Sequence, residues 1–307
     1  MVTQRRALLL AAGAAALASA GCSLIPRPAL IPIPTLRLAG PCTGGQAPTL
    51  VVMLPGAYSL PQEFVDEGFV QALRERRIAA DTCIADAHLG YFSDRSVMER
   101  LRVDVIGPAR RQGYRRIWLV GISLGGFGAL AYGAAYGSGS GSRAGSGSGS
   151  SFGSSSGIES GSESGSGSGS KAGHGVDGVL ALAPYLGRRG LLQEIAAAPS
   201  PAAWAAGEAG VQAGVQAGVQ PGALAQGQEP EAAERELWRW LVRPPAGAPP
   251  VWLGYGRDDR LGEGHRLLRQ ALPAERVFDV PGGHDWAPWR ALWQAWLDRS
   301  LLGTDCA

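Results

Sequence analysis

The residues best suited to chemistry in this chain are a serine, a pair of aspartates and a histidine. Ser123 is the central residue of 121–125, Gly-Ile-Ser-Leu-Gly, which matches the pattern G-x-S-x-G. Asp258 and Asp259 follow an apolar run, and His284 lies in a glycine-rich loop after a later apolar run. A serine that passes its proton to a histidine, while a carboxylate orients that histidine, is a nucleophile for acyl groups. These residue types could therefore carry out nucleophilic catalysis at a carbonyl carbon.

The G-x-S-x-G pattern is a weak signal by itself, because the chain matches it twice. Residues 153–157 also fit, but they lie in a tract of glycine and serine with no strand or helix pattern around them. Ser123 instead follows the apolar run 116–120 and precedes a run of small residues suited to a helix. A serine at such a strand-to-helix turn is held in a strained conformation with its hydroxyl exposed. The alternative interpretation is a tight glycine-rich turn in which the serine has no catalytic role.

Short apolar runs recur along the chain, and each is typical of a strand that is buried on both faces. Helix-compatible segments separate several of them, which is the alternation of a parallel sheet. In such a sheet, functional residues gather beyond the carboxyl ends of the strands. The sequence therefore predicts an α/β fold with a mostly parallel central sheet flanked by helices. The expected strands are residues 49–54, 78–85, 116–120, 177–184, 250–255 and 276–280.

Taken together, these motifs resemble the α/β-hydrolase superfamily over roughly residues 48–136, 176–190 and 248–303. The order serine, aspartate, histidine is that of the superfamily and differs from the orders found in two unrelated protease folds. The resemblance implies that Ser123 is the nucleophile and that His284 is the general base. It also implies that the chemistry needs no cofactor and no metal ion.

The resemblance extends to the remaining groups of the site. The family spacing G-x-x-D-x-[LV] places the acid at Asp259, with Asp258 as the alternative, because neighbouring residues of an extended segment point to opposite sides. The oxyanion donors would be the backbone N–H groups of Ala57, in the turn after the first expected strand, and of Leu124. Asp285 is better suited to cap the closing helix than to act as the acid.

The other histidines are weaker candidates. His88 follows the second expected strand, where it either lines the pocket or packs against its neighbours. His174 lies in the Gly/Ser tract, and His265 lies inside a polar helix pattern. A stripe of tryptophans at helical spacing predicts core packing of the last helix. These are Trp286, Trp289, Trp293 and Trp296.

The start of the chain resembles a bacterial export signal. Residues 1–21 combine an arginine pair with an apolar, alanine-rich run that is too short for a comfortable membrane span. Ser-Ala-Gly-Cys at 19–22 resembles a lipobox, in which Cys22 would be lipidated, although leucine is usual at its first position. The proline- and glycine-rich residues 22–47 would form a tether. We therefore expect an exported lipoprotein of the cell envelope, held by a lipid anchor on the periplasmic face of the outer membrane.

Two segments interrupt the expected sheet. Residues 137–175 are mostly glycine and serine, and they carry too little apolar surface to offset the entropy of ordering, so we expect disorder. Residues 191–247 depart from the strand–helix rhythm and include three copies of Ala-Gly-Val-Gln at 209–220. Insertions at this place form a cap in many α/β-hydrolases. Residues 229–242 have a helical pattern, and their tryptophans either face an acyl pocket or attach the cap to the body.

Composition limits the partners. The formal net charge of +2 is too small to suggest nucleic-acid binding. With Cys22 assigned to a lipid, three cysteines remain, and an oxidising compartment favours a bridge between Cys42 and Cys83. Neither a C-x-x-C pair nor a histidine cluster suggests a metal site.

The sequence therefore predicts a serine esterase that acts on a small-molecule ester or acyl substrate through an acyl-enzyme. An acyltransferase, a thioesterase or a peptidase would use the same triad and remains an alternative. A lipoprotein that keeps the fold as a binding module is an alternative of another class.

Overall fold

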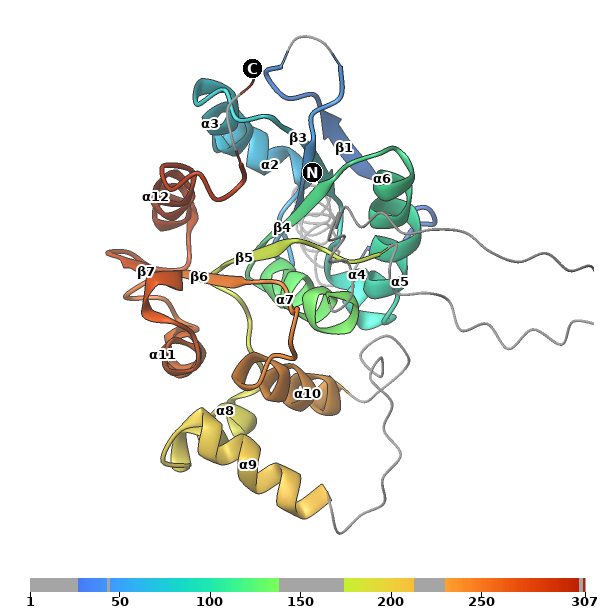
Figure 1. Cartoon of the computed structure of the whole chain (residues 1–307). Helices are drawn as coiled ribbons and strands as arrows, with labels where there is room; N and C mark the ends of the chain where they lie inside the picture. Colours follow the sequence, from blue (N-terminus) through green and yellow to red (C-terminus); the bar gives the residue numbers. More distant parts are fainter. Residues whose placement is uncertain (1–26, 43–44, 138–173, 213–229, 304–305, 307) are drawn as a thin grey trace, which may run out of the picture.

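The computed structural model describes residues 27–42, 45–137, 174–212, 230–303 and 306. Within these residues, a sheet of seven strands has the order β1-β3-β2-β4-β5-β6-β7 (Figure 1). Neighbouring strands are parallel except β1, which pairs antiparallel with β3. The strands are β1 (Thr35–Leu38), β2 (Thr49–Leu54), β3 (Ala80–Ala85), β4 (Arg116–Ile122), β5 (Gly178–Leu182), β6 (Val251–Gly256) and β7 (Val277–Val280).

Helices cover both faces of this sheet. In Figure 1, α2, α3 and α12 lie on one side and α4 to α7 on the other, while α8, α9 and α10 extend beyond the sheet. The α-helices are α2 (Pro61–Asp66), α3 (Phe69–Glu75), α4 (Leu89–Ser93), α5 (Val97–Arg100), α6 (Gly107–Arg111), α7 (Leu124–Tyr136), α8 (Arg189–Ala197), α9 (Pro201–Gln212), α10 (Pro230–Val242), α11 (Gly262–Ala271) and α12 (Trp286–Leu297). A π-helical segment, Leu101–Ile106, joins α5 to α6, and a 3₁₀ turn, Ala274–Arg276, precedes β7.

Strand β2 shows why the sequence folds this way. Its apolar residues alternate between two core clusters, with Leu50, Val52 and Leu54 in one and Val51 and Met53 in the other. A strand buried on both faces has to be apolar throughout, which is the pattern that the sequence shows. The expected α/β fold with a mostly parallel sheet is confirmed.

The start of the sheet differs from expectation. Residues 35–38, which lie within the expected tether 22–47, form the antiparallel edge strand β1. Leu36 and Leu38 pack against the core cluster on the α2–α3 side, and Arg37 between them is exposed. A four-residue alternation between proline- and glycine-rich flanks is too short to predict a strand, so its pairing with β3 decides the outcome.

The insertions are described only in part. Residues 138–173 of the expected Gly/Ser insertion and residues 213–229, which hold most of the short repeat, lie outside the described residues. The described part of 191–247 forms α8, α9 and α10, which we call the cap. Of the two tryptophans at 229–242, Trp238 is buried and Trp240 packs partly buried against the same core cluster, in agreement with the interpretation that they attach the cap. No helix in the described ranges is long and apolar enough to cross a membrane.

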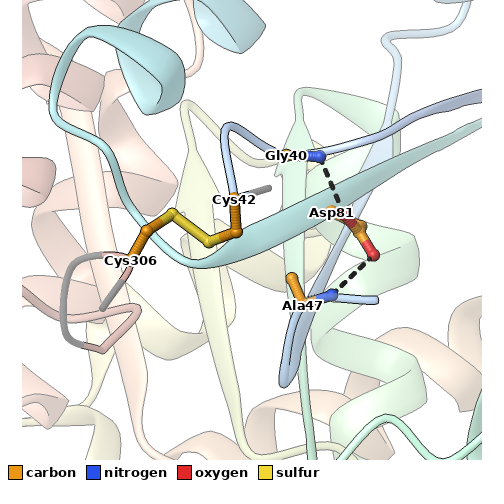
Figure 2. Close-up of a disulfide and its surroundings, with 5 residues drawn as sticks. All are labelled: Gly40, Cys42, Ala47, Asp81 and Cys306. Atoms are coloured by element: carbon orange, nitrogen blue, oxygen red, sulfur yellow. Dashed lines mark hydrogen bonds between the residues drawn. A yellow bond between two sulfur atoms is a disulfide. The ribbon is translucent and has the colours of Figure 1, made fainter. Parts of the chain in front are cut away.

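The disulfide differs from the expected one. Cys42 pairs with Cys306, with 5.3 Å between their Cα atoms (Figure 2). Cys83 is instead a free, buried thiol in β3. The expected Cys42–Cys83 bridge is therefore wrong, because the Cys83 side chain faces the apolar core. Burial raises the pKa of this thiol and keeps it protonated. Asp81 braces the loop of Cys42 by accepting the Gly40 N–H at 2.7 Å and the Ala47 N–H at 3.2 Å.

Removal of this bridge is expected to lower the free energy of unfolding. The Cys42–Cys306 bond closes a loop with a sequence separation of 264, and long loops lose the most entropy on closure. Cys306→Ser should therefore cost about 3–5 kcal/mol in urea unfolding. Cys83→Ala is the matched control and should keep the bridge, visible as an unreactive cysteine pair in mass spectrometry. An unchanged midpoint for Cys306→Ser would contradict the pairing.

Candidate active site

Ser123 occupies a strained turn between β4 and α7. Its φ of 54° and ψ of −115° are unfavourable for a residue with a side chain, at a cost of about 1–3 kcal/mol. The motif glycines allow the turn: a Cβ at Gly121 would overlap the carbonyl oxygen of Gly125, and a Cβ at Gly125 would overlap that of Leu54. The sequence G-x-S-x-G therefore permits a close approach of strand, turn and helix that no larger residue could make.

Backbone hydrogen bonds hold this turn while its side chain stays uncommitted. The Ser123 N–H donates to Leu182 at 3.0 Å, and the Ser123 carbonyl accepts from Tyr185 at 2.9 Å and from Phe127 at 3.1 Å. The side chain makes no capping hydrogen bond to α7. The main chain is thus fixed by β5 and the loop after it, and the hydroxyl is left for other partners.

The expected oxyanion donors lie next to this serine. Leu124 is the first residue of α7, and an N–H in the first turn of a helix has no acceptor within that helix. Ala57 follows Gly56, where a Cβ would sit only 3.6 Å from the Ser123 Cβ. The structure therefore brings the turn of Ala57 beside the turn of Ser123. The assignment of both N–H groups to an oxyanion hole stays a prediction.

His284 and Asp259 form a hydrogen-bonded pair. The His284 Nδ1 lies 2.8 Å from Asp259 Oδ2 and 3.0 Å from Oδ1, and the two side chains are 8% and 0% exposed. Burial alone would raise the pKa of Asp259, but hydrogen bonds from His284 and from the Leu261 N–H outweigh it and hold the pKa below its ordinary value. This carboxylate is therefore ionised and fixed, as a group that orients a histidine has to be.

The neighbouring aspartate has a different place. Asp258 is exposed, and its backbone N–H donates to the Gly282 carbonyl at 3.0 Å. That bond ties the loop after β6 to the loop that carries His284. Asp285 caps α12, with its side chain accepting the Ala287 N–H at 3.0 Å, as predicted. The geometry thus favours Asp259 over Asp258 and Asp285 as the partner of His284.

Ser123 and the Asp259–His284 pair lie at the same edge of the sheet. Ser123, Asp259 and His284 follow β4, β6 and β7, which run parallel, so all three lie beyond the same carboxyl edge. The loop after β5 lies between the serine and the pair. Its Tyr185 N–H donates to Ser123, and its Pro184 carbonyl lies 3.0 Å from the Nε2 of His265.

The other histidines have structural surroundings. His88 begins α4, accepts the Gly90 N–H on Nδ1 at 3.1 Å and packs on Tyr91, so the packing interpretation fits it. His174 accepts the Tyr132 hydroxyl on its carbonyl at 3.1 Å. His265 is fully buried instead of lying on a polar surface, and burial lowers its pKa to about 4. A neutral His265 therefore supports the loop after β5.

Sequence reasoning missed the groups that hold this loop to the cap. Glu234 of α10, 4% exposed, accepts the Tyr185 hydroxyl at 2.8 Å and the Arg188 N–H at 3.0 Å. Trp238 of the same helix donates its Nε1–H to the Leu186 carbonyl at 2.6 Å. Their spacing of four residues puts both on one helix face. An acidic residue on the tryptophan face of a predicted helix was the available signal.

Ion pairs join the three cap helices. Arg235 of α10 contacts Glu194 of α8 at 2.8 Å and Glu208 of α9 at 3.3 Å, and Trp204 donates to Glu194 at 2.8 Å. Hydrogen bonds from Arg235, then Trp204, lower the pKa of Glu194 to about 2. A network of this kind is expected to fix the helices relative to one another more than a single exposed pair would.

The cap is therefore expected to loosen in acid. Because the folded-state pKa of Glu194 is lowered, its stabilisation is complete above the ordinary glutamate pKa of about 4.3 and is lost as pH falls toward about 2. The side chain is 41% exposed, so solvent screening limits the effect to about 1 kcal/mol. Melting temperatures of wild type and Glu194→Gln should differ at pH 6 and converge toward about pH 2. A constant difference would contradict this assignment.

Comparisons with known proteins support the fold. No protein-family model matches the chain, and no curated protein matches its sequence. Among solved structures, an acetyl ester-xyloside bifunctional hydrolase from Caldicellulosiruptor lactoaceticus is similar over 92% of this chain and 100% of its own, with a TM-score of 0.53 and 14% identity. An S-formylglutathione hydrolase from Staphylococcus aureus is similar over 90% and 99%, with a TM-score of 0.49 and 13% identity. At such identities the likeness concerns the fold alone: this chain has the α/β-hydrolase fold.

Proposed function

We propose that this chain is a serine hydrolase that cleaves a carboxylic ester through a covalent acyl-enzyme. The hydrogen-bonded pair of Asp259 and His284, beyond the same sheet edge as the strained Ser123, carries the proposal. An acetyl ester hydrolase with the same fold supports an ester as the substrate class. An acyltransferase, a thioesterase or a peptidase with the same triad is the alternative in which only the leaving group or the acceptor differs.

The proposed first half-reaction transfers the acyl group to the enzyme. His284 takes the Ser123 proton on Nε2 as Oγ bonds to the carbonyl carbon, and Asp259 holds the proton on Nδ1 and stabilises the imidazolium. The N–H groups of Ala57 and Leu124 receive the negative oxygen, each contributing about 2.7–4 kcal/mol. The ester C–O bond then breaks, and the alcohol leaves with the proton from His284.

The second half-reaction repeats these steps with water. His284 takes a proton from water as the hydroxyl oxygen bonds to the acyl carbon. The tetrahedral intermediate collapses, the bond to Ser123 Oγ breaks, and His284 returns the proton to that oxygen. The carboxylic acid leaves, and the residues are as they were at the start.

For the cell, we propose an exported lipoprotein whose body faces the periplasm from the outer membrane. The apolar, alanine-rich start and the lipobox-like residues ending at Cys22 support this placement. A disulfide between Cys42 and Cys306 agrees with an oxidising compartment. The proposed anchor is a lipid on Cys22, so Cys22→Ala should leave the membrane fraction and still hydrolyse soluble esters.

A fluorophosphonate probe tests the proposed chemistry. It reacts with serines that a base activates, so it should label Ser123 and no other residue. Ser155, which has the same G-x-S-x-G surroundings in the Gly/Ser tract, is the internal control. A panel of matched ester, thioester and amide substrates, run with and without an acceptor alcohol, then separates esterase from the alternatives. Label on Ser155, or none on protein that is folded by circular dichroism, would count against the proposal.

A further inference from the structure

The first described residues of the chain lie on the sheet edge that carries the candidate site. The Arg27 guanidinium makes hydrogen bonds of 2.9 and 3.0 Å with the carboxylate of Asp86, the first residue after β3. The Arg27 carbonyl is so close to Gly90 that a Cβ there would overlap it. Next to Gly90, the Leu89 N–H donates to the Ala57 carbonyl at 3.4 Å. A short series of contacts therefore connects Arg27 to the turn beside Ser123.

The segment after Arg27 is fixed, yet it exposes large apolar side chains. The Tyr91 hydroxyl accepts the Leu30 N–H at 2.9 Å and donates to the Leu30 carbonyl at 3.0 Å. The Ile33 N–H donates to Asp104 at 2.9 Å. Between these points the side chains of Leu30 and Ile31 are 56% and 76% exposed. Large apolar side chains that are exposed together are typical of interaction surfaces.

The turn after Ala57 also exposes two large apolar side chains. Tyr58 is 84% exposed and Leu60 is 50% exposed. Among the described residues, the large apolar side chains that are exposed comprise these two, Leu30, Ile31 and Val103. We call Leu30, Ile31, Tyr58 and Leu60 the apolar rim. The rim is thus made by two segments that both contact the loop after β3.

The length of chain before Arg27 limits what the rim can face. Cys22 is five residues before Arg27, so even a fully extended chain would reach about 18 Å. A body of this size is about 45 Å across. A lipid on Cys22 therefore cannot reach a membrane on the far side of the body. The bilayer has to lie on the side of Arg27, which is the side of the rim.

We propose that the apolar rim rests on a lipid bilayer and that the candidate site takes acyl esters presented by membrane lipids. The proposal rests on the proposed esterase function and on the lipid at Cys22. Moving an apolar side chain from water into the membrane–water interface lowers its free energy. Tyrosine is favoured at this interface because its ring is apolar and its hydroxyl group is polar. The bound orientation holds the site against the layer that contains its substrate.

Orientation can be measured without any catalysis. Ile31→Cys, carrying an environment-sensitive dye, is added as full lipidated chain to vesicles of phosphatidylethanolamine and phosphatidylglycerol. The dye should shift its emission to shorter wavelength on vesicles, and the same dye on Ala274→Cys, exposed before β7 at the opposite end of the sheet, should not. Equal shifts at both positions, or none at either, would overturn the proposal.

Turnover is then measured on two substrates with the same acyl chain: a fluorogenic acylglycerol in those vesicles, and a water-soluble aryl ester. Insertion of 20 glycine and serine residues between Cys22 and Arg27 lengthens the chain that joins the lipid to the body about fivefold, because these residues are now five positions apart. Turnover of the vesicle ester should fall about tenfold, because effective concentration falls as roughly the −3/2 power of linker length. Ile31→Glu should also lower it, whereas Ala274→Glu should not, and all variants should match wild type on the soluble ester.

The outcomes separate the two proposals. Absence of soluble turnover in wild type would remove the esterase function and leave the dye experiment to decide the orientation. Soluble turnover with equal vesicle turnover in all variants would overturn the membrane-facing site. Concentration-dependent dimers of Cys22→Ala that Ile31→Glu abolishes would assign the rim to a second copy of the chain and overturn the proposal as well.

Discussion

Ser123→Ala is expected to lower kcat by about 10⁶ and to leave the fold unchanged, as loss of the nucleophile does in a serine protease of unrelated fold. The substitution removes one oxygen from a side chain that makes no capping bond to its helix. Backbone bonds to Leu182, Phe127 and Tyr185 hold the turn, and alanine keeps all of them. Turnover of the soluble ester gives kcat, and circular dichroism shows whether the fold is unchanged. Ser155→Ala is the matched control and should keep full activity.

A second substitution separates a catalytic serine from an idle one. At φ 54° a residue with a side chain is strained, and glycine relieves that strain. Ser123→Gly should therefore raise the free energy of unfolding by about 1 kcal/mol or more while activity is lost to the same degree as in Ser123→Ala. A position that is kept strained despite an available stabilising replacement is typical of function. Retained turnover in either variant would refute the nucleophile.

The six parallel strands and the turn of Ser123 could be predicted because their signals are local. An apolar run such as 49–54 has one low-energy environment, a sheet covered on both faces. The motif glycines are needed because backbone atoms of Leu54 and Gly125 leave no room for a Cβ. His284 was expected as the base from the resemblance to the α/β-hydrolase superfamily. The structure pairs it with Asp259, and its catalytic role stays a prediction.

The features that sequence reasoning missed depend on contacts between distant residues. Cys306 meets Cys42 because the last described residue lies beside α3, where its N–H donates to the Arg77 carbonyl at 2.8 Å. β1 forms because it pairs with the edge of the sheet at β3. His265 is buried by Tyr255 and by the loop after β5, which no helical pattern can reveal. In each case the partner, rather than the segment itself, decides the structure.

The loop after β5 shows how the cap and the site are joined. Tyr185 donates its N–H to Ser123 and its hydroxyl to Glu234, so one residue bridges the nucleophile turn and α10. Ala183, at a φ of 45°, adds a second strained position next to the first. Strained turns persist only where the surroundings hold them, and here β5, His265 and the cap do so. A change in cap position is therefore expected to reach Ser123 through this loop, in which Tyr185 contacts both.

Asp259→Asn is expected to lower kcat by about 10⁴ without unfolding the protein, the size of effect seen for the same change in a serine protease. The geometry supplies the reason. Asp259 Oδ1 accepts the Leu261 N–H at 2.7 Å, which fixes the amide oxygen of an asparagine at that position. The amide NH₂ then faces His284 Nδ1, 2.8 Å from the present Oδ2. Nδ1 then has to accept a hydrogen bond from this amide, so the ring proton moves to Nε2. With Nε2 protonated, His284 can no longer take the proton of Ser123.

Asp258→Asn is the matched control, because its exposed side chain leaves the pair intact and its N–H still donates to Gly282. It should stay within about twofold of wild type. Since the pKa of Asp259 is lowered in the fold, its contribution to stability is complete above the ordinary aspartate pKa and is lost as pH falls through the folded value. The stability difference between wild type and Asp259→Asn should therefore shrink only in strong acid. A severe loss of kcat/KM in Asp258→Asn with a near-normal Asp259→Asn would move the acid by one residue and overturn the assignment.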